Sequence, residues 1–346
     1  MTRGLSRFQV ESQALLAGLI AGVLGAIIAE VVFWGRDAAL WGAWSIGVVA
    51  GILVAVAVLL AAFLGYWRAR YRPGQEWRLS LPSWKFIVDA TAVALVHAIV
   101  ATLLTWAVFI LLQMSFQGLV LPAGWASIFI GVTTGLTAYW TNLSVSHLNT
   151  ERMTTLLVVF MVVSILTSMA TAPVPNWWEY HFSELGSFGT ASSWLFNFSL
   201  ISAGLLLVGF SLYLNRDLQA LVDAGSLTNR RSPGIISGGF VIAGFALAGV
   251  GLVPVNVNLI IHNTFATGML LVVAGILLAS AWLLRGLPWQ IIVMTYAFLA
   301  GIAISVVLFM PVGYFNLTAL ELIAFALIFA WVSVFIRMLS AKLATD

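Results

Sequence analysis

The sequence predicts an all-α protein, a polytopic integral membrane helix bundle of ten transmembrane helices with both termini in the cytoplasm. Three observations lead to this prediction. Of the 346 residues, 62% are hydrophobic and 8% are charged, whereas charged residues make up about a quarter of a soluble domain. Apolar stretches long enough to cross a bilayer recur along the whole chain. The basic residues fall almost entirely in alternate loops, as the positive-inside rule requires.

Ten stretches are long and apolar enough to cross the hydrocarbon core, which takes about 20 helical residues. The first stretch is too long for the apolar core of a cleavable signal peptide, so we interpret it as the first span. The expected ranges are 13–34, 41–66, 86–113, 120–142, 153–172, 192–214, 234–254, 262–284, 289–312 and 317–337.

Lysine and arginine predict the orientation of these spans. Of the 15 basic residues, all but Arg36 lie on one side of the predicted topology. The positive-inside rule assigns that side to the cytoplasm. The residues on it are Arg3, Arg7, Arg68, Arg70, Arg72, Arg78, Lys85, Arg152, Arg216, Arg230, Arg231, Arg285, Arg337 and Lys342.

Composition and motifs exclude several kinds of function. The chain has no cysteine, which rules out disulfides, thiolate nucleophiles and iron–sulfur clusters. It also lacks a phosphate-binding P-loop, a dinucleotide fingerprint and a GxSxG elbow. The net charge of +3 gives no indication of nucleic-acid binding. We therefore predict no cofactor, with zinc as the alternative that histidine and carboxylate ligands would allow.

Glycines four residues apart recur in several expected spans. Such small residues let the backbones of neighbouring helices approach closely, so they predict packing within the bundle, with a homodimer face as the alternative. The pairs are Gly18 and Gly22, Gly47 and Gly51, Gly131 and Gly135, and Gly234 and Gly238. All nine prolines lie in loops or near the ends of spans. None therefore interrupts a helix at the bilayer midplane, as happens in many transporters.

Ionisable residues inside spans are costly, which makes them functional candidates until a partner explains them. Asp89 follows Lys85 by four residues, the spacing of an ion pair along one helix face. Glu321 follows Thr318 by three residues, the spacing of a capping box. His97 has no charged neighbour in sequence, and we expect a neutral imidazole that is hydrogen-bonded to another helix.

A polar stretch in the middle of the chain is PVPNWWEYHFSELGSFGT, residues 173–190. Asn176 and Glu179 have the spacing of a capping box, and Gly186 is a typical helix stop, so we predict a short helix over 177–185. One face of this helix would anchor it in the outer membrane interface. The residues on that face are Trp178, Phe182 and Leu185.

The predicted topology brings scarce acids and histidines to the outer side of the membrane. His181 and Glu184 share a helix face at i and i+3, and His262 begins the eighth span. Glu30, in the outer half of the first span, either reaches the interface or faces a cavity. We predict an outward-facing polar pocket, in which His181, Glu184 and His262 would be the ligands of any metal. The pocket candidates are Glu30, His97, Glu179, His181, Glu184, Asn197, His262, Asn263 and Glu321.

Two runs, HFSELGSFGTASSWLFNFSLISAGLLL at 181–207 and VNLIIHNTFATGMLL at 257–271, resemble the domain-of-unknown-function 998 family of bacteria and archaea. That family is a six-helix unit. Its first outer loop carries a Ser-Glu/Asp-Leu-Gly run ahead of a Trp-Leu-Phe-Asn helix start, and its fourth helix opens with a histidine. The matching positions are Ser183, Glu184, Leu185, Gly186, Trp194, Phe196, Asn197 and His262.

The resemblance covers about residues 153–340 and implies a multi-pass protein of a prokaryotic plasma membrane. It divides the chain into a four-helix unit at 1–150 and a six-helix unit at 151–346. The family is similar in layout to the eukaryotic damage-regulated autophagy modulator group, whose relatives are implicated in membrane-lipid remodelling and lipid asymmetry. Ceramidase-like membrane hydrolases use paired histidines in a late span, which this chain lacks.

These observations favour a role in envelope lipid handling, in which the outer pocket binds a lipid headgroup or a partner protein. The expected partners are membrane lipids, a membrane protein or a second copy of the chain, and not nucleic acid. One alternative is a secondary transporter with five-plus-five inverted repeats. The other is a metal-assisted membrane lipid hydrolase or acyltransferase.

Overall fold

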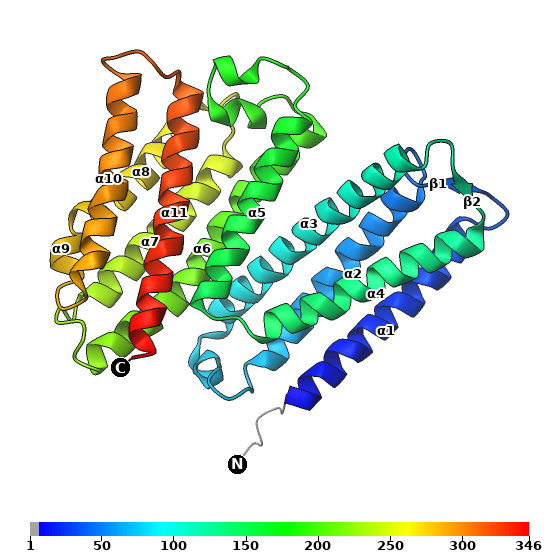
Figure 1. Cartoon of the computed structure of the whole chain (residues 1–346), viewed down its shortest axis with the longest axis horizontal. Coiled ribbons are helices and arrows are strands. Elements are labelled where there is room, and N and C mark those ends of the chain that lie inside the picture. The colour runs from blue at the N-terminus through cyan, green and yellow to red at the C-terminus, as the bar shows by residue number, and fades with distance from the viewer. Residues whose placement is uncertain (1–6, 346) are drawn as a thin grey trace. The chain divides into compact units, whose positions relative to one another are not determined.

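The computed structural model describes residues 7–345, so Arg3 lies outside the described residues. Within that range the chain is almost entirely helical (Figure 1). It divides into two compact units, Met1–Leu148 and Asn149–Asp346. We call them unit 1 and unit 2 and describe each by itself.

Unit 1 contains four long helices and a short β-ladder. The helices are α1 (Arg7–Val32), α2 (Ile46–Ala69), α3 (Ser83–Ser115) and α4 (Ala123–Ser146). The antiparallel strands β1 (Ala38–Ala39) and β2 (Val120–Leu121), which the sequence analysis did not predict, tie the α1–α2 loop to the α3–α4 loop. A 3-10 helix, η1 (Glu76–Ser80), lies in the loop between α2 and α3.

Unit 2 contains six long helices that run alternately up and down (Figure 1). They are α5 (Thr150–Ala170), α6 (Ala191–Asp223), α7 (Ser232–Leu252), α8 (Leu259–Leu278), α10 (Trp289–Phe309) and α11 (Leu317–Leu343). Three shorter helices accompany them: η2 (Trp177–Glu179), η3 (Phe182–Gly186) and α9 (Ser280–Leu283). Helix α6 continues nine residues beyond the predicted end at 214, so the predicted loop 215–233 is partly helical.

A helix lies at each of the ten predicted positions, and nine of these helices are long and apolar enough to cross a membrane. The all-α membrane fold is thus confirmed, and the chain is a multi-pass membrane protein. Helix α4 is not among the nine, because Thr, Tyr, Trp and Asn residues crowd positions 133–142. It nevertheless packs antiparallel along α1, which is a candidate span. A Ser127–Glu30 hydrogen bond of 2.7 Å lies toward one end of the pair, and a Tyr139–Glu11 bond of 3.1 Å lies toward the other.

Close approach at glycine joins α1 to α4. A Cβ added at Gly18 would lie 2.9 Å from the Gly135 carbonyl oxygen, and one at Gly22 would lie 3.1 Å from that of Gly131. The prediction of packing within the bundle is confirmed here, and also for Gly47 and Gly51, which face α3. It is wrong for Gly234 and Gly238, where an added Cβ would meet nothing within 4 Å in the described chain.

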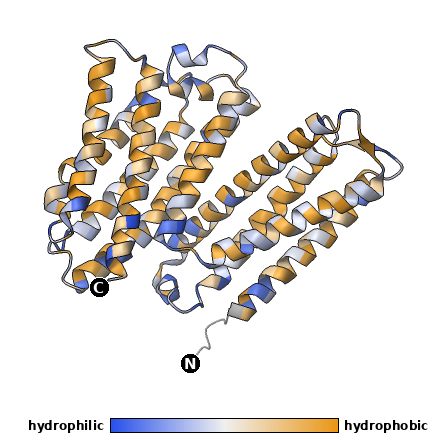
Figure 2. Ribbon diagram, viewed as in Figure 1, coloured by the Kyte–Doolittle hydropathy of each residue, from blue (hydrophilic) through white to orange (hydrophobic). Residues whose placement is uncertain are grey.

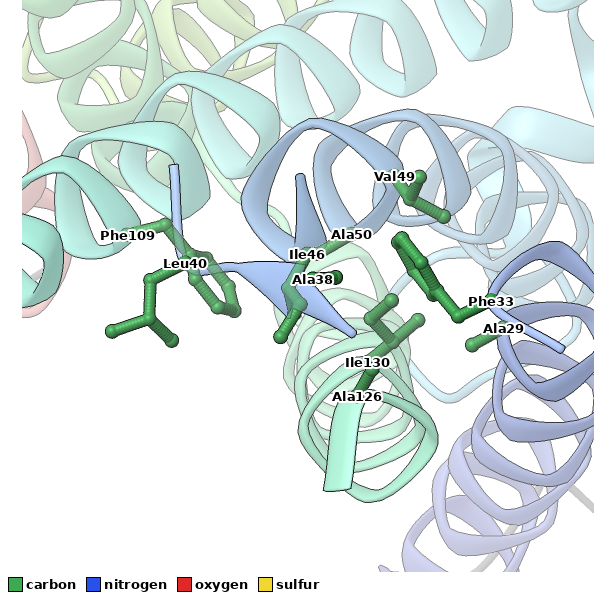
Figure 3. Packing of buried hydrophobic residues seen from close by; sticks show 10 residues of the cluster. All are labelled: Ala29, Phe33, Ala38, Leu40, Ile46, Val49, Ala50, Phe109, Ala126 and Ile130. Carbon is green, nitrogen blue, oxygen red and sulfur yellow. The ribbon is translucent and has the colours of Figure 1, made fainter. Parts of the chain in front are cut away.

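The cores of the two units differ in kind. Near the β-ladder, unit 1 buries small and branched side chains around Phe33 and Phe109 (Figure 3). Unit 2 instead buries a row of rings where α6, α7 and α11 meet. Trp331 stacks on Phe240 at a centroid distance of 6.3 Å, and its indole N–H donates to Thr295 of α10 at 3.1 Å. This bond satisfies the one polar atom of the largest buried side chain.

We predict that Gly135→Ala destabilises unit 1 by about 1–3 kcal/mol, the usual cost of overpacking. The reason is that the new Cβ would lie 2.9 Å from the Gly18 carbonyl oxygen and 3.2 Å from Gly22 Cα. Thermal denaturation in detergent measures the effect. Gly124→Ala in the same helix is the control, because its Cβ meets nothing within 4 Å and the better helix propensity of alanine should leave stability equal or higher. Equal melting temperatures for the two variants would contradict this packing.

Candidate functional site

The charged and polar residues of unit 2 gather at its two ends (Figure 2). All the basic residues of the unit lie at or near one end, which we call the basic end: Arg152, Arg216, Arg230, Arg231, Arg285, Arg337 and Lys342. The three connections at the other end, residues 171–190, 253–258 and 310–316, contain no lysine or arginine. We call these three connections the polar cap.

The longest connection of the polar cap is not the continuous helix predicted over 177–185. It forms η2 and η3, and His181 between them has extended backbone angles, φ −157° and ψ 160°. The predicted capping box is also wrong, since the Asn176 side chain donates to the Glu179 carboxylate at 3.2 Å rather than accepting a backbone N–H. The break in the helix lets side chains on both sides of it turn into the bundle.

Three of the large apolar residues of this connection face inward. Trp177, Phe182 and Leu185 are buried, and the ring of Phe182 packs edge-on against Phe196 of α6 at a centroid distance of 5.3 Å. Trp178 is 51% exposed. Of the three residues predicted to anchor the segment in the membrane interface, only Trp178 therefore remains available for that role.

Besides Ser193, whose hydroxyl accepts the N–H of Phe188 at 3.1 Å, four side chains hold loop 171–190 in place by hydrogen bonds to its backbone. One is a carboxylate and three are asparagine amides. The bonds are Phe182 N–H to Glu321 Oε2 at 2.6 Å, Asn316 Nδ2 to the Trp178 carbonyl at 2.8 Å, Asn197 Nδ2 to the Gly186 carbonyl at 2.9 Å, and Asn256 Nδ2 to the Ser187 carbonyl at 3.1 Å. The loop is thus tied to α6, to α11 and to the connection between α7 and α8.

Glu321 does not form the predicted capping box with Thr318. Asn316 caps α11 instead, since its side chain accepts the N–H of Ala319 at 2.9 Å. This frees the Glu321 carboxylate to reach the backbone of Phe182. This N-cap could have been predicted from the sequence, because Asn316 immediately precedes the last apolar stretch and asparagine is a preferred N-cap residue.

His181, Glu184 and His262 form the one cluster of predicted site residues that the described structure brings together. His181 Nε2 lies 3.4 Å from Glu184 Oε2, and the two side chains are 25% and 23% exposed. His262 is 4% exposed, and its Nδ1 donates to the Val253 carbonyl at 2.7 Å. Burial lowers the pKa of His181, the Glu184 carboxylate opposes this shift, and the nearby His262 adds to it. We call these three residues the imidazole–carboxylate cluster.

The other predicted site residues of unit 2 have different surroundings. Glu179 bonds to Asn176, Asn263 is exposed, and Asn197 serves to hold the loop. Glu30 belongs to unit 1, where it accepts a hydrogen bond from Ser127.

His97 also belongs to unit 1 and makes the predicted bond across helices. Its Nε2 lies 3.0 Å from the Ser144 hydroxyl of α4, and its Nδ1 lies 2.8 Å from the Val93 carbonyl. The neutral tautomer with hydrogen on Nδ1 satisfies both ring nitrogens. This histidine therefore has a structural explanation that needs no ligand.

Sequence reasoning missed a buried polar group in unit 1. Asp89 does not pair with Lys85; it is 1% exposed and accepts a hydrogen bond from the hydroxyl of Tyr66. The guanidinium of Arg78, itself buried, lies over the Tyr66 ring at 4.4 Å. Arg78 lies in η1 and Asp89 in α3, so the two residues do not share one helix whose spacing could relate them. No pattern in the sequence could therefore have joined them.

The cluster in unit 2 lies inside a recognised family region. The family model described as "Protein of unknown function (DUF998)" matches residues 155–338, which is more than half of the 346-residue chain. The chain belongs to the DUF998 family. No curated protein and no solved structure matches it.

The DUF998 region begins within α5 and ends within α11, so all six long helices of unit 2 contribute to it. It contains the whole imidazole–carboxylate cluster and all four side chains that hold loop 171–190. Unit 1 lies outside the match. In residues 7–345, no three His, Cys, Asp or Glu side chains are arranged to hold a metal ion.

We predict that Glu321→Leu loosens the polar cap of this DUF998 protein, because the buried N–H of Phe182 loses its acceptor. The expected loss of stability is about 1–3 kcal/mol, the cost of an unsatisfied buried donor. Glu321→Gln is the matched control, since its amide oxygen can still accept the bond. The melting temperature and the rate of proteolysis within 171–190 provide the measurement. Equal behaviour of the leucine and glutamine variants would show that this bond does not hold the loop.

Proposed function

We propose that this protein binds the headgroup of a membrane lipid at its polar cap, as part of lipid handling in a prokaryotic plasma membrane. The observation that carries the proposal is the imidazole–carboxylate cluster. Two partly exposed groups of opposite character, His181 and Glu184, lie beside the buried His262. Around them, the loop backbone is held by the carboxylate and asparagine bonds described above.

The chemistry of the cluster suits a headgroup that carries both charges. A protonated imidazole donates hydrogen bonds to a phosphate, and a carboxylate accepts them from an amine. The exposed Trp178 and Tyr180 beside the cluster are residues typical of the membrane–water interface. The positive-inside rule assigns the basic end to the cytoplasm and the cap to the outer leaflet. A zwitterionic aminophospholipid of that leaflet is therefore the preferred ligand.

The alternatives receive less support. The division into four and six helices gives no basis for five-plus-five inverted repeats. A metal-assisted hydrolase would need a ligand set that the described residues do not assemble. A protein partner at the same cap would use the same exposed residues, and the following experiment distinguishes it from a lipid.

We predict that the protein binds phosphatidylethanolamine more tightly at pH 5.5 than at pH 7.5. Because burial lowers the pKa of His181, this imidazole is neutral at pH 7.5 and gains its charge only as the pH falls below the usual value of 6.5. The positive charge then attracts the lipid phosphate. Native mass spectrometry of the full chain, titrated with the lipid at both pH values, measures the affinity.

His181→Gln should remove this pH dependence and weaken binding at pH 5.5 about tenfold, the value of one charge-assisted hydrogen bond. His147→Gln is the matched control, because it removes an exposed imidazole of unit 1 that lies outside the cap. A His181→Gln variant that binds like wild type at both pH values would contradict the proposal. So would binding of a protein partner in the absence of any lipid preference.

A further inference from the structure

A groove runs between α5 and α11 within unit 2. Near the basic end it has a volume of about 690 Å³ and is lined by Arg152 and Thr155 of α5 and by Ser333 and Arg337 of α11. Toward the polar cap it continues as a second space of about 370 Å³. Val158, Ala330 and Ser333 line both spaces, so the two adjoin along the helix pair. We call it the α5–α11 groove.

Two unpaired cations flank the end of the groove near the basic end. Arg152 and Arg337 come from different helices and are exposed. Neither guanidinium makes a hydrogen bond or an ion pair with another residue in the part of the chain that the structure describes. Glu151 is the acid that lines the same space, which leaves a net charge of +1 there.

The arginines supply the side-chain donors in this space. The Thr155 hydroxyl donates to the Glu151 carbonyl at 3.0 Å, and the Ser333 hydroxyl donates to the Phe329 carbonyl at 2.8 Å. Both hydroxyl hydrogens are thus used within their own helices. A guanidinium presents a planar fork that matches the oxygens of a phosphate, and two of them facing one space suit a phosphate monoanion.

The rest of the groove suits a hydrocarbon chain. Beyond Ser333 its lining is apolar, with Leu166 of α5 and Phe325 and Phe329 of α11 as the larger side chains. In Figure 2, α11 is hydrophobic along most of its length and hydrophilic near its lower end. The lining of the two spaces extends along α11 from Arg337 to Leu322, which is about 22 Å at the rise of an α-helix. This length exceeds half of a hydrocarbon core of about 30 Å, so one extended acyl chain fits within it.

We infer that the α5–α11 groove binds an anionic glycerophospholipid from the leaflet at the basic end, with its phosphate between Arg152 and Arg337 and one acyl chain along the groove. A free phosphate would use only the arginines, and a neutral lipid would use only the apolar part. The combination of an unpaired cationic end with an adjoining apolar space selects a ligand that has both a phosphate and a hydrocarbon chain. This site is separate from the polar cap, so it does not depend on the function proposed there.

The test titrates the full chain in detergent with phosphatidylglycerol and with phosphatidylcholine of the same acyl chains, using native mass spectrometry. Wild type should bind phosphatidylglycerol more tightly. The double variant Arg152→Gln, Arg337→Gln should weaken that binding about thirtyfold, the expected effect of two interfacial charges. Phosphatidylcholine binding should weaken by a smaller factor, because the choline ammonium offsets the charge of its phosphate. Glu151→Gln should strengthen phosphatidylglycerol binding about fivefold, since it removes a repelling charge.

Arg285→Gln is the matched control. It removes an exposed arginine at the same end of unit 2 that does not line the groove, and it should leave both affinities unchanged. Ala330→Trp fills the junction of the two spaces and should weaken the binding of both lipids while the melting temperature stays at the wild-type value. The inference is overturned if the double arginine variant behaves like the control, or if Ala330→Trp binds phosphatidylglycerol normally. Inorganic phosphate that competes with phosphatidylglycerol at equal concentration would overturn it as well, because the acyl chain would then add nothing.

Discussion

The high cost of an unpaired polar or charged group in hydrocarbon is the constraint on which the rest of this structure depends. It explains why the basic residues of unit 2 stand at one end and why three ionisable side chains within the helices have hydrogen-bond partners. His97 bonds to Val93 and Ser144, Glu321 bonds to the backbone of Phe182, and Glu30 bonds to Ser127. The bonds to Ser144, to Phe182 and from Ser127 each join two segments that are distant in sequence. The bond to Val93 lies within α3 and orients the His97 ring. The few polar residues that the helices contain therefore also help to fix the packing of the bundle.

The polar cap follows from that constraint. Where α5 ends and α6 begins, the chain must turn outside the apolar layer, and carboxylate and asparagine side chains bond to its backbone. The breaks in the loop helix bury Phe182 and Leu185 while leaving His181 and Glu184 partly exposed. The two proposed lipid sites differ in the kind of charged group that they present. The cap presents His181, whose pKa burial lowers, whereas the α5–α11 groove presents arginines that stay charged.

Much of this architecture could be predicted from the sequence, because apolar length and the positions of arginine report directly on the bilayer. The helices follow from these signals, the glycine contacts between α1 and α4 follow from the spacing of small residues, and the DUF998 resemblance follows from the runs at 181–207 and 257–271. The candidate site was harder. The pairings expected for Asp89 and Glu321 rested on local spacing, and tertiary partners replaced both: Tyr66 for Lys85, and the Phe182 backbone for the start of α11. The helix predicted over 177–185 was wrong for a related reason. The burial of Trp177, Phe182 and Leu185 outweighed a weak local preference for one continuous helix.

Both proposed sites depend on one orientation, in which the basic end of unit 2 faces the cytoplasm and the polar cap faces outward. The accessibility of introduced cysteines tests this orientation most directly. The chain has no cysteine, so single variants can be labelled without background. Thr171→Cys lies in the polar cap and Ala224→Cys follows α6 at the basic end, and both positions are exposed. In intact cells, a membrane-impermeant maleimide should label the first and leave the second unlabelled until the cells are lysed. Labelling of Ala224→Cys from outside, with Thr171→Cys protected, would contradict the account.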